Sequence, residues 1–293
     1  MRSHGTTVAT RWGAGLAAGF LATWLALSGA SDAVAKSSKP ERSSDWSAKG
    51  MGTEGNEDWK YSFDIPAGKT IEIKGINGDI HARRTLDKKV EVRAWKHAKH
   101  SDPGEVKIES FEHAGGVTVC AVYPSPGRDE NTCEPGEGGH SHTRNNDVVV
   151  EFEVLVPAGV GFAGRTVNGD VEAVSLEGPV EAHTVNGGVE VSTTKTAEAS
   201  TVNGSIKVRM DAEASKEDLE FSTVNGGITV EFAGDVDADV SASTVNGDIQ
   251  TDFPIMVKGS ISRRRVQGTL GHGGRDLKLE TVNGSIRLLK SGA

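Results

Sequence analysis

The sequence predicts an all-β protein, built as a right-handed parallel β-solenoid with coils of about 20 residues. The tetrapeptide Thr-Val-Asn-Gly is repeated at Thr166, Thr184, Thr201, Thr223, Thr244 and Thr281. Apolar and polar residues alternate on both sides of each copy, which is the period of a β-strand. Glycine reaches 37 residues while aromatic residues are only 5% of the chain, and this composition suits thin β layers packed close to the backbone.

The spacing of the repeats predicts the coil length. Successive asparagines from Asn168 to Asn246 are 18, 17, 22 and 21 residues apart, and Asn283 follows after 37, close to two periods. A variant copy, Ile76-Asn77-Gly78, precedes them. We expect glycine to supply a positive-φ residue at each corner. The predicted corners are Asn77, Gly78, Asn168, Gly169, Asn186, Gly187, Asn203, Gly204, Asn225, Gly226, Asn246, Gly247, Asn283 and Gly284.

A second architecture also fits the repeats, namely an antiparallel hairpin meander or barrel. Asn-Gly between two strands is a strong hairpin signal, and two-residue turns would give workable registers. A hairpin, however, has no need for Thr-Val before every Asn-Gly. A stack of coils does, because identical residues form ladders on their copies. The glycines Gly169, Gly178 and Gly187, spaced by nine, suggest that both corners of a coil have similar chemistry.

Residues 1–35 read as a signal peptide. Arg2 and Arg11 precede an apolar run, and Ala33-Val34-Ala35 supplies a small-residue cleavage site. An uncleaved membrane anchor is the alternative. We expect an exported protein in the periplasm, on the outer surface or outside the cell, with no other segment apolar enough to cross a bilayer. Residues 36–58, rich in Ser, Lys, Gly and Glu, predict a flexible linker.

Ordered structure is expected from Trp59 onward. Residues 59–123 predict an N-terminal β module, residues 124–147 an exposed loop with few apolar residues, and residues 148–290 the repeat solenoid. The layout around Pro66 and Asn77 returns around Pro157 and Asn168, so one module occurs twice with an offset of 91 residues. Val266-Gln267-Gly268-Thr269-Leu270 resembles a degenerate corner, so we expect the solenoid to run through this region intact.

Cys120 and Cys133 are the only cysteines, and two thiols in an oxidising compartment usually pair. We therefore expect a disulfide, which stabilises the fold by about 3 kcal/mol on the chain-entropy estimate.

Little in the chain predicts cofactor or metal chemistry. Asp79, Asp170 and Asp248 follow Asn-Gly, but the intervening repeats carry Gly or Ser there, so no acidic column forms for calcium. His140 and His142, near Cys133, Glu134 and Glu137, lie in a loop without an evident metal scaffold. The net charge of −9 argues against nucleic acid. Arg263, Arg264 and Arg265 form the one dense basic run, a possible contact for a polyanion such as an acidic glycan.

The export signal, the Gly75-Ile76-Asn77-Gly78-Asp79 segment and the serial Thr-Val-Asn-Gly units resemble a family of bacterial secreted proteins. These are candidate adhesins with a domain of unknown function, related to adhesin head domains that carry a Gly-Ile-Asn motif. The resemblance covers about residues 59–290. It implies a parallel β-solenoid at the cell envelope and no catalytic residues. The loop 124–147 departs from the repeat pattern.

The sequence therefore predicts a noncatalytic secreted or envelope protein that presents an extended surface for adhesion or scaffolding. Its expected partner is a surface glycan or an envelope protein, and its end coils could pair with another copy. Two alternatives remain. One is a carbohydrate-active β-helix enzyme, because long grooves suit polysaccharides. The other is an envelope signalling or sensing component.

Overall fold

Two β-sheets make up the described part of the chain. The computed structural model describes residues 57–291, apart from residues 126, 128, 129, 140–142, 212–215 and 258–261. All of them belong to one unit, Ala35–Ala293. The expected signal peptide and nearly all of the linker lie outside the described residues.

The strands alternate with short connections, and the one helical turn is the 3₁₀ turn η1 (Pro103–Glu105) among the residues described. In chain order the strands are β1 (Glu57–Phe63), β2 (Thr70–Lys74), β3 (Ile80–Arg84), β4 (Val90–His97), β5 (Lys107–His113), β6 (Gly116–Val122), β7 (Val149–Val156), β8 (Gly161–Arg165), β9 (Val171–Leu176), β10 (Val180–His183), β11 (Val189–Thr193), β12 (Ala197–Asn203), β13 (Ile206–Asp211), β14 (Leu219–Asn225), β15 (Ile228–Ala233), β16 (Ala238–Asn246), β17 (Ile249–Thr251), β18 (Ile255–Val257), β19 (Arg265–Leu270), β20 (Arg275–Asn283) and β21 (Ile286–Lys290). Within the described ranges no helix is long and apolar enough to cross a bilayer.

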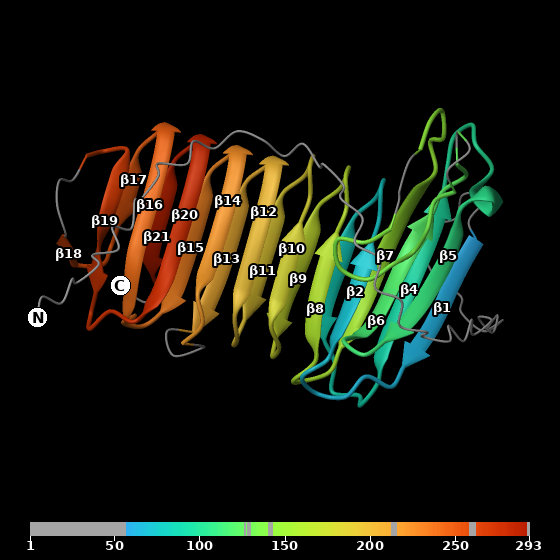
Figure 1. The fold of residues 1–293 in the computed structure, drawn as a ribbon, viewed down its shortest axis with the longest axis horizontal. Coiled ribbons are helices and arrows are strands. Elements are labelled where there is room, and N and C mark those ends of the chain that lie inside the picture. Colours follow the sequence, from blue (N-terminus) through green and yellow to red (C-terminus); the bar gives the residue numbers. More distant parts are fainter. Residues whose placement is uncertain are drawn as a thin grey trace, which may run out of the picture. The chain divides into compact units, whose positions relative to one another are not determined.

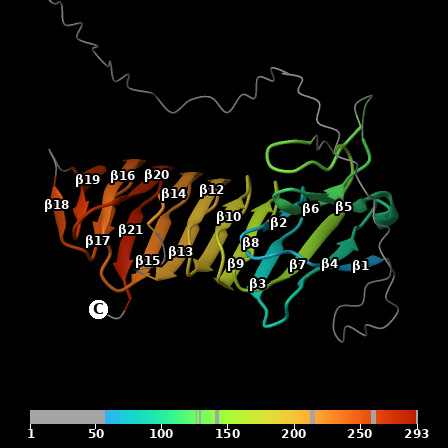
Figure 2. The ribbon, with the colours of Figure 1, turned by 60° about the horizontal axis from the view of Figure 1, so that its bottom comes forward.

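Each coil contributes one strand to each sheet. The ten-stranded sheet has the order β1-β4-β7-β3-β9-β11-β13-β15-β21-β17, and the eleven-stranded sheet has the order β18-β19-β16-β20-β14-β12-β10-β8-β2-β6-β5. Figure 2 shows the two sheets as separate layers, with β12 and β14 in one and β13 and β15 in the other. The strands on either side of an Asn-Gly corner, such as β12 and β13, therefore lie in different sheets. The predicted β-solenoid is confirmed, and the hairpin alternative is wrong for the repeats.

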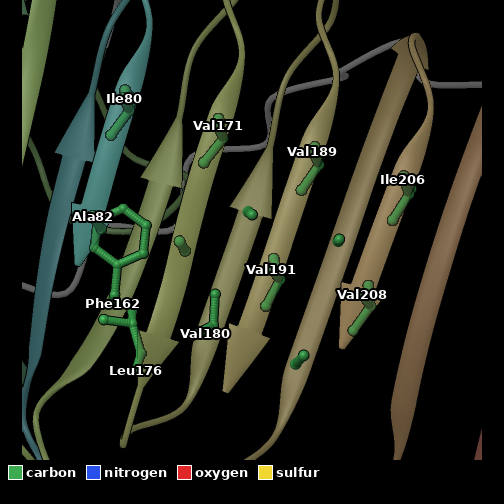
Figure 3. Packing of buried hydrophobic residues seen from close by; sticks show 14 of the residues in the cluster. Ile80, Ala82, Phe162, Val171, Leu176, Val180, Val189, Val191, Ile206 and Val208 are labelled. Carbon is green, nitrogen blue, oxygen red and sulfur yellow. The ribbon is translucent and has the colours of Figure 1, made fainter. Parts of the chain in front are cut away.

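Parallel pairing in register builds the core between the sheets. Ile80 pairs with Val171, Val171 with Val189, and Val189 with Ile206, so that equivalent side chains form a column (Figure 3). The members of this column are at most 2% exposed. Neighbouring parallel strands are about 4.8 Å apart, which brings aliphatic side chains of each column into contact. The alternation in the sequence therefore determines which side chains enter the core.

Two coils lie out of sequence order. The coil β2–β3 sits between β6–β7 and β8–β9, which explains why its sequence layout recurs 91 residues later: Asn77 and Asn168 are neighbours in the stack. At the other end, β20–β21 sits between β14–β15 and β16–β17. The coils therefore do not follow one another in chain order at either place. Residues 59–123 supply strands to the same two sheets as residues 148–290 (Figure 1).

Antiparallel strands are added at both ends of the stack, in both sheets at one end and in the eleven-stranded sheet at the other. β4 runs antiparallel to β7 and β1 to β4, while β5 runs antiparallel to β6. At the opposite end β19 pairs antiparallel with β16, and β18 with β19. The segment Val266–Leu270 belongs to β19, so it reverses direction instead of continuing the solenoid, and that expectation is wrong. The reversal lets the chain return and place β20–β21 inside the stack.

The corner glycines are required by close stacking more than by positive φ. Gly78, Gly169 and Gly284 have φ values of 122°, 157° and 159°, whereas Gly187, Gly204, Gly226 and Gly247 lie outside the positive-φ region. A Cβ atom on Gly204 would lie 1.8 Å from the carbonyl oxygen of Gly187 in the neighbouring coil. The positive-φ explanation is therefore wrong for most corners, and backbone contact between coils replaces it.

We predict that Gly204→Ala lowers the free energy of unfolding by about 3 kcal/mol, because the methyl group would push apart two stacked coils. Gly188→Ala is the matched control in a neighbouring corner, since its Cβ would meet Ser205 O at 3.5 Å, an ordinary contact. We expect that change to stay within about 0.5 kcal/mol. Chemical denaturation of both variants measures the difference, and equal stability would contradict the close-stacking account.

Candidate interaction surface along the coil corners

An asparagine ladder runs along the corners. Each asparagine of the ladder except Asn77, which only accepts within it, donates its side-chain amide to the amide oxygen of the asparagine in an adjacent coil, over distances of 2.7–2.9 Å. In spatial order its members are Asn77, Asn168, Asn186, Asn203, Asn225, Asn283 and Asn246. An amide both donates and accepts, so a single residue type can extend this chain of bonds through any number of coils.

The threonine of each repeat is a buried partner of the corner glycine. Thr201 Oγ1 donates to Gly187 O at 2.9 Å, and Thr223 Oγ1 donates to Gly204 O at 2.9 Å. Thr166, Thr184, Thr281 and Thr244 bond in the same way to Gly78, Gly169, Gly226 and Gly284. These hydroxyls satisfy carbonyl groups at the bend of the chain, which would otherwise lack a partner at this position.

The valine of each repeat faces outward. Its exposed fraction ranges from 36% to 56%. Because threonine and valine are consecutive in a strand, they point to opposite faces of the sheet. The register of β12, β14, β20 and β16 pairs equivalent residues, so these valines follow one another along the stack. We call this row the valine stripe: Val167, Val185, Val202, Val224, Val282 and Val245.

The stripe is the feature that the sequence reasoning missed. The ladders of identical residues expected for Thr-Val did not place the valine on the outer surface. The sequence did contain a signal for the outward valine. The inward positions of this repeat are Leu219, Phe221 and Thr223, so Val224 is an apolar residue at an outward position. A residue out of phase with the buried positions must face solvent.

The long loop ends the stripe on one side. Ile76, which occupies the position of the valine in the Asn77 coil, is only 5% exposed and belongs to the core. The stripe therefore begins at Val167. Next to Val167 lies a pocket of about 220 Å³, which the loop lines with Asn131, Thr132 and residues 136–139.

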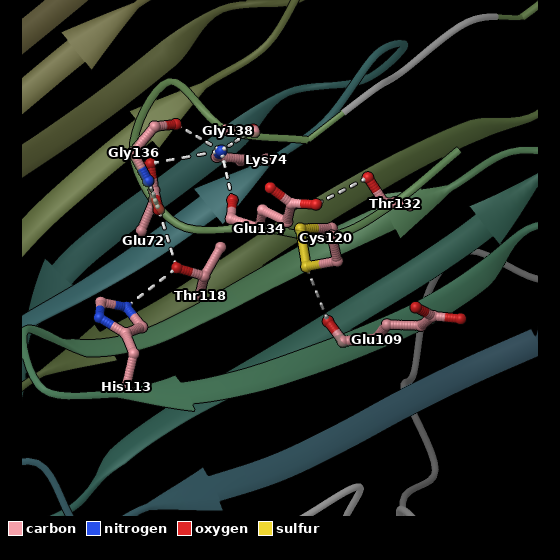
Figure 4. The surroundings of a disulfide bond; sticks show 11 residues. Glu72, Lys74, Glu109, His113, Thr118, Cys120, Thr132, Glu134, Gly136 and Gly138 are labelled. Atoms are coloured by element: carbon pink, nitrogen blue, oxygen red, sulfur yellow. Dashed lines mark hydrogen bonds and ion pairs between the residues drawn. A yellow bond between two sulfur atoms is a disulfide. The ribbon is translucent and has the colours of Figure 1, made fainter. Parts of the chain in front are cut away.

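Lys74 and a disulfide hold this loop on the eleven-stranded sheet. Cys120 in β6 and Cys133 in the loop are bonded, with a Cα–Cα distance of 5.7 Å. The Lys74 ammonium donates to the carbonyl oxygens of Glu134 at 2.6 Å and Gly138 at 3.0 Å, and also to that of Gly136 (Figure 4). Burial lowers the pKa of Lys74. The loop thus has fixed attachments on its sheet side.

A buried carboxylate lies under the loop. Glu72 is 6% exposed, and its Oε2 accepts bonds from Thr118 Oγ1 at 2.8 Å and from Gly136 N at 3.0 Å. Arg165 extends from the adjacent strand, with Nε 3.3 Å from Glu72 Oε1 and Nη1 2.7 Å from Glu137 Oε1 of the loop. Arg165 therefore links the loop to the sheet beside the start of the stripe.

His183 and Ser200 form a pair in the next coils along the same row. His183 Nδ1 lies 2.7 Å from Ser200 Oγ. Burial, reinforced by the Arg165 charge, lowers the pKa of His183 to about 4. A serine and a histidine are two parts of a nucleophilic triad, whose third part is a carboxylate that orients the imidazole. Here the residue beside His183 in the adjacent strand is the cation Arg165.

The remaining candidate residues have separate positions. Asp79 Oδ1 accepts from Asp170 N at 2.8 Å, and Asp170 Oδ1 accepts from Gly188 N at 2.6 Å, so these carboxylates join adjacent corners. Arg263, Arg264 and Arg265 are exposed at the Val245 end of the stripe. His140 and His142 lie outside the described residues. No group of three His, Cys, Asp or Glu side chains in the described part is placed to hold a metal ion.

Comparison with known proteins finds a match to one domain family. Residues 164–289 match the family Toastrack DUF4097. A crystal structure of a candidate cell adhesion protein from Clostridium sporogenes ATCC 15579 is similar, with 11% identity, a TM-score of 0.45 and coverage of 80% of this chain and 100% of that chain. A candidate adhesin from Bacteroides fragilis NCTC 9343 shows 12% identity, a TM-score of 0.37 and coverage of 79% and 96%. No curated protein matches the sequence.

We predict that His183 makes the fold less stable in acid. Its folded pKa of about 4 lies below the ordinary 6.5, so the unfolded chain binds the proton first. Stability contributed by neutral His183 is present above pH 6.5 and is lost as the pH falls through 4, by roughly 3 kcal/mol in total. The difference in unfolding free energy between the wild type and His183→Gln across this window measures it. An NMR titration of His183 near 6.5 would refute the assignment.

Proposed function

Taking residues 164–289 as a Toastrack domain of DUF4097, we propose that the chain is a noncatalytic exported β-solenoid that presents an extended surface for adhesion or scaffolding. The valine stripe carries the proposal. Threonine and asparagine of the same motif each make bonds within the stack, whereas the valines are left 36–56% exposed in six stacked coils. A continuous apolar row in water is unfavourable, and such rows commonly mark contact surfaces.

The flanks of the stripe are polar and equally regular. The asparagine amides follow it on one side. On the other side the outward residues of successive strands include Ser200, which pairs with Ser222, and Ser243, which pairs with Glu280. An apolar centre between hydrogen-bonding rims is the usual composition of a binding surface. A surface glycan or an envelope protein with a repeated structure fits this arrangement, because each coil offers the same groups.

We expect the triple variant Val185→Thr, Val202→Thr, Val224→Thr to lose binding to its cell or glycan surface by roughly tenfold, because three apolar contacts become polar at nearly constant shape. Threonine retains the β-branched form, so the melting temperature should change little. Whole-cell binding and a glycan array measure the loss.

The control is the triple variant Leu155→Thr, Val174→Thr, Leu289→Thr, which also replaces three apolar side chains by threonine, at half-buried positions on the outer face of the ten-stranded sheet. It should retain binding. Equal losses in both triples would remove the stripe from the proposal. Release of product from any polysaccharide in the same assay would overturn the noncatalytic assignment in favour of a carbohydrate-active enzyme.

The proposed location is the cell envelope or the exterior. The Cys120–Cys133 disulfide supports it, because such bonds persist in oxidising compartments. We expect the exported protein to begin at Lys36, as mass spectrometry of the exported fraction can show. Ala35→Asp should leave an uncleaved precursor, since the cleavage site needs a small residue there. Wild-type protein that remains in the cytoplasm with residues 1–35 intact would refute export.

A further inference from the structure

We infer that the arginine run is an anion-binding cap at the end of the solenoid, which takes a linear acidic polysaccharide. This inference rests on the proposed role of the chain as a binding surface, and it assigns a ligand chemistry to one end of it. The residues concerned are Arg263, Arg264 and Arg265, with Arg287 on the neighbouring face.

The backbone of the run takes the place of a further coil. In the middle of the stack, Thr184 N donates to Ser200 O and Val189 N donates to Ser205 O of the next coil. In the last coil, Thr244 N donates to Arg264 O at 2.9 Å and Ile249 N donates to Arg263 O at 3.0 Å. Two consecutive arginines therefore accept the bonds that another coil would accept, and they close the corner.

The turn that carries the run is also held by bonds within itself and by the pairing of β19 with β16. Ser262 Oγ accepts from Arg265 N at 3.0 Å and from Arg264 N at 3.3 Å. Arg265 also begins β19, opposite Ser243 in β16. A backbone fixed in this way presents the side chains at a defined place, so less ordering is needed when a ligand binds.

The guanidinium groups of the run have no bonded partner in the described part of the chain. Arg263, Arg264 and Arg265 are exposed, and none of them has a side-chain hydrogen bond or ion pair with any described residue. Other arginines of the outer faces do have such partners: Arg84 pairs with Glu177 at 2.7 Å, and Arg209 pairs with Glu231 at 3.3 Å. A guanidinium presents a planar set of donors that matches carboxylate, sulfate or phosphate oxygens.

A fourth guanidinium belongs to the same end. Arg287 in β21 is exposed, has no ion pair within the described part of the chain, and pairs in register with Gln250 of β17. Gln250 follows Ile249, whose N–H is bonded to Arg263. Two acidic groups lie nearby. Glu280 pairs with Lys278 at 3.4 Å, and Asp248 forms no ion pair with the run.

The acidic row on the outer face of the eleven-stranded sheet disfavours an anionic ligand away from this cap. Glu181, Glu198 and Glu220 stand in register on the outer face of the eleven-stranded sheet, and burial with the two neighbouring charges raises the pKa of Glu198. The whole chain carries a net charge of −9. A nucleic acid, with about one charge per 1.7 Å, would be repelled more strongly than a polysaccharide with one charge per sugar or fewer. Neutral faces of sugar rings can also reach Val245, the most exposed valine of the stripe at 56%.

The test compares two triple variants of the full exported chain. The first is Arg263→Gln, Arg264→Gln, Arg265→Gln. The second, Arg83→Gln, Arg84→Gln, Arg209→Gln, changes the net charge equally but at arginines with glutamate partners. Binding to polygalacturonate, κ-carrageenan, polyphosphate and DNA is measured at about 20 mM and about 150 mM salt.

We expect the first triple to lose about tenfold in affinity for a carboxylate or sulfate polysaccharide at low salt, and the second to lose less than about threefold. The two polysaccharide arms identify which anion is preferred. Absence of wild-type binding, equal loss in both triples, or binding only to polyphosphate or DNA would overturn the inference.

A second measurement separates ligand binding from edge protection, because charged residues at a sheet edge also prevent aggregation. Sedimentation of the first triple should show the same monomer or oligomer as the wild type. Self-association of that variant, without polyanion binding by the wild type, would assign the run to edge protection. If the variant Val185→Thr, Val202→Thr, Val224→Thr loses surface binding but the first arginine triple does not lose polysaccharide binding, the proposed function is retained and this inference is refuted.

Discussion

Contact between the backbones of adjacent corners is the constraint on which the rest of the structure depends. At each corner glycine a carbonyl oxygen of the adjacent coil lies so close that a Cβ atom cannot fit; an added Cβ would be 1.8 Å from this oxygen at Gly204 and at Gly226. Only this approach allows a threonine hydroxyl to reach the same carbonyl and the asparagine amides to bond to one another. Parallel register in both sheets follows, because the corners align the strands on either side.

This constraint explains why one tetrapeptide serves both stability and surface. The threonine hydroxyl and the glycine carbonyl bond to each other within the stack. The asparagine side chain donates to one neighbouring coil and accepts from the other. Valine is the residue left over. Because valine follows an inward threonine, strand alternation alone directs it to the surface. Repetition of the structural motif therefore also repeats an apolar group along the surface. A solenoid can in this way build a long contact surface from short-range rules.

The two ends of the stack show how the chain ends the series of parallel coils. Antiparallel strands cover the outer coils, and Arg263 and Arg264 accept the bonds of the last corner. Both ends also place a coil out of chain order. At the first end the long loop then crosses the outer face, where Lys74, Glu72 and Arg165 hold it beside the stripe. The departures from the repeat thus meet the two ends of the valine stripe.

The sequence by itself determined the strand content, the inward positions of each repeat, the corner residues and the pairing of Cys120 with Cys133, because these depend on local alternation and on a short list of residue types. It could not determine the order of the coils. Asn77 neighbours Asn168 and Asn283 neighbours Asn225 through bonds between identical residues, so no residue type distinguishes one neighbour from another. Only the tertiary structure decided this order, together with the reversal at β19, the close contact that requires glycine, and the neighbours of Arg165 and the arginine run. These features arise from segments far apart in the chain, and their geometry has no local signature.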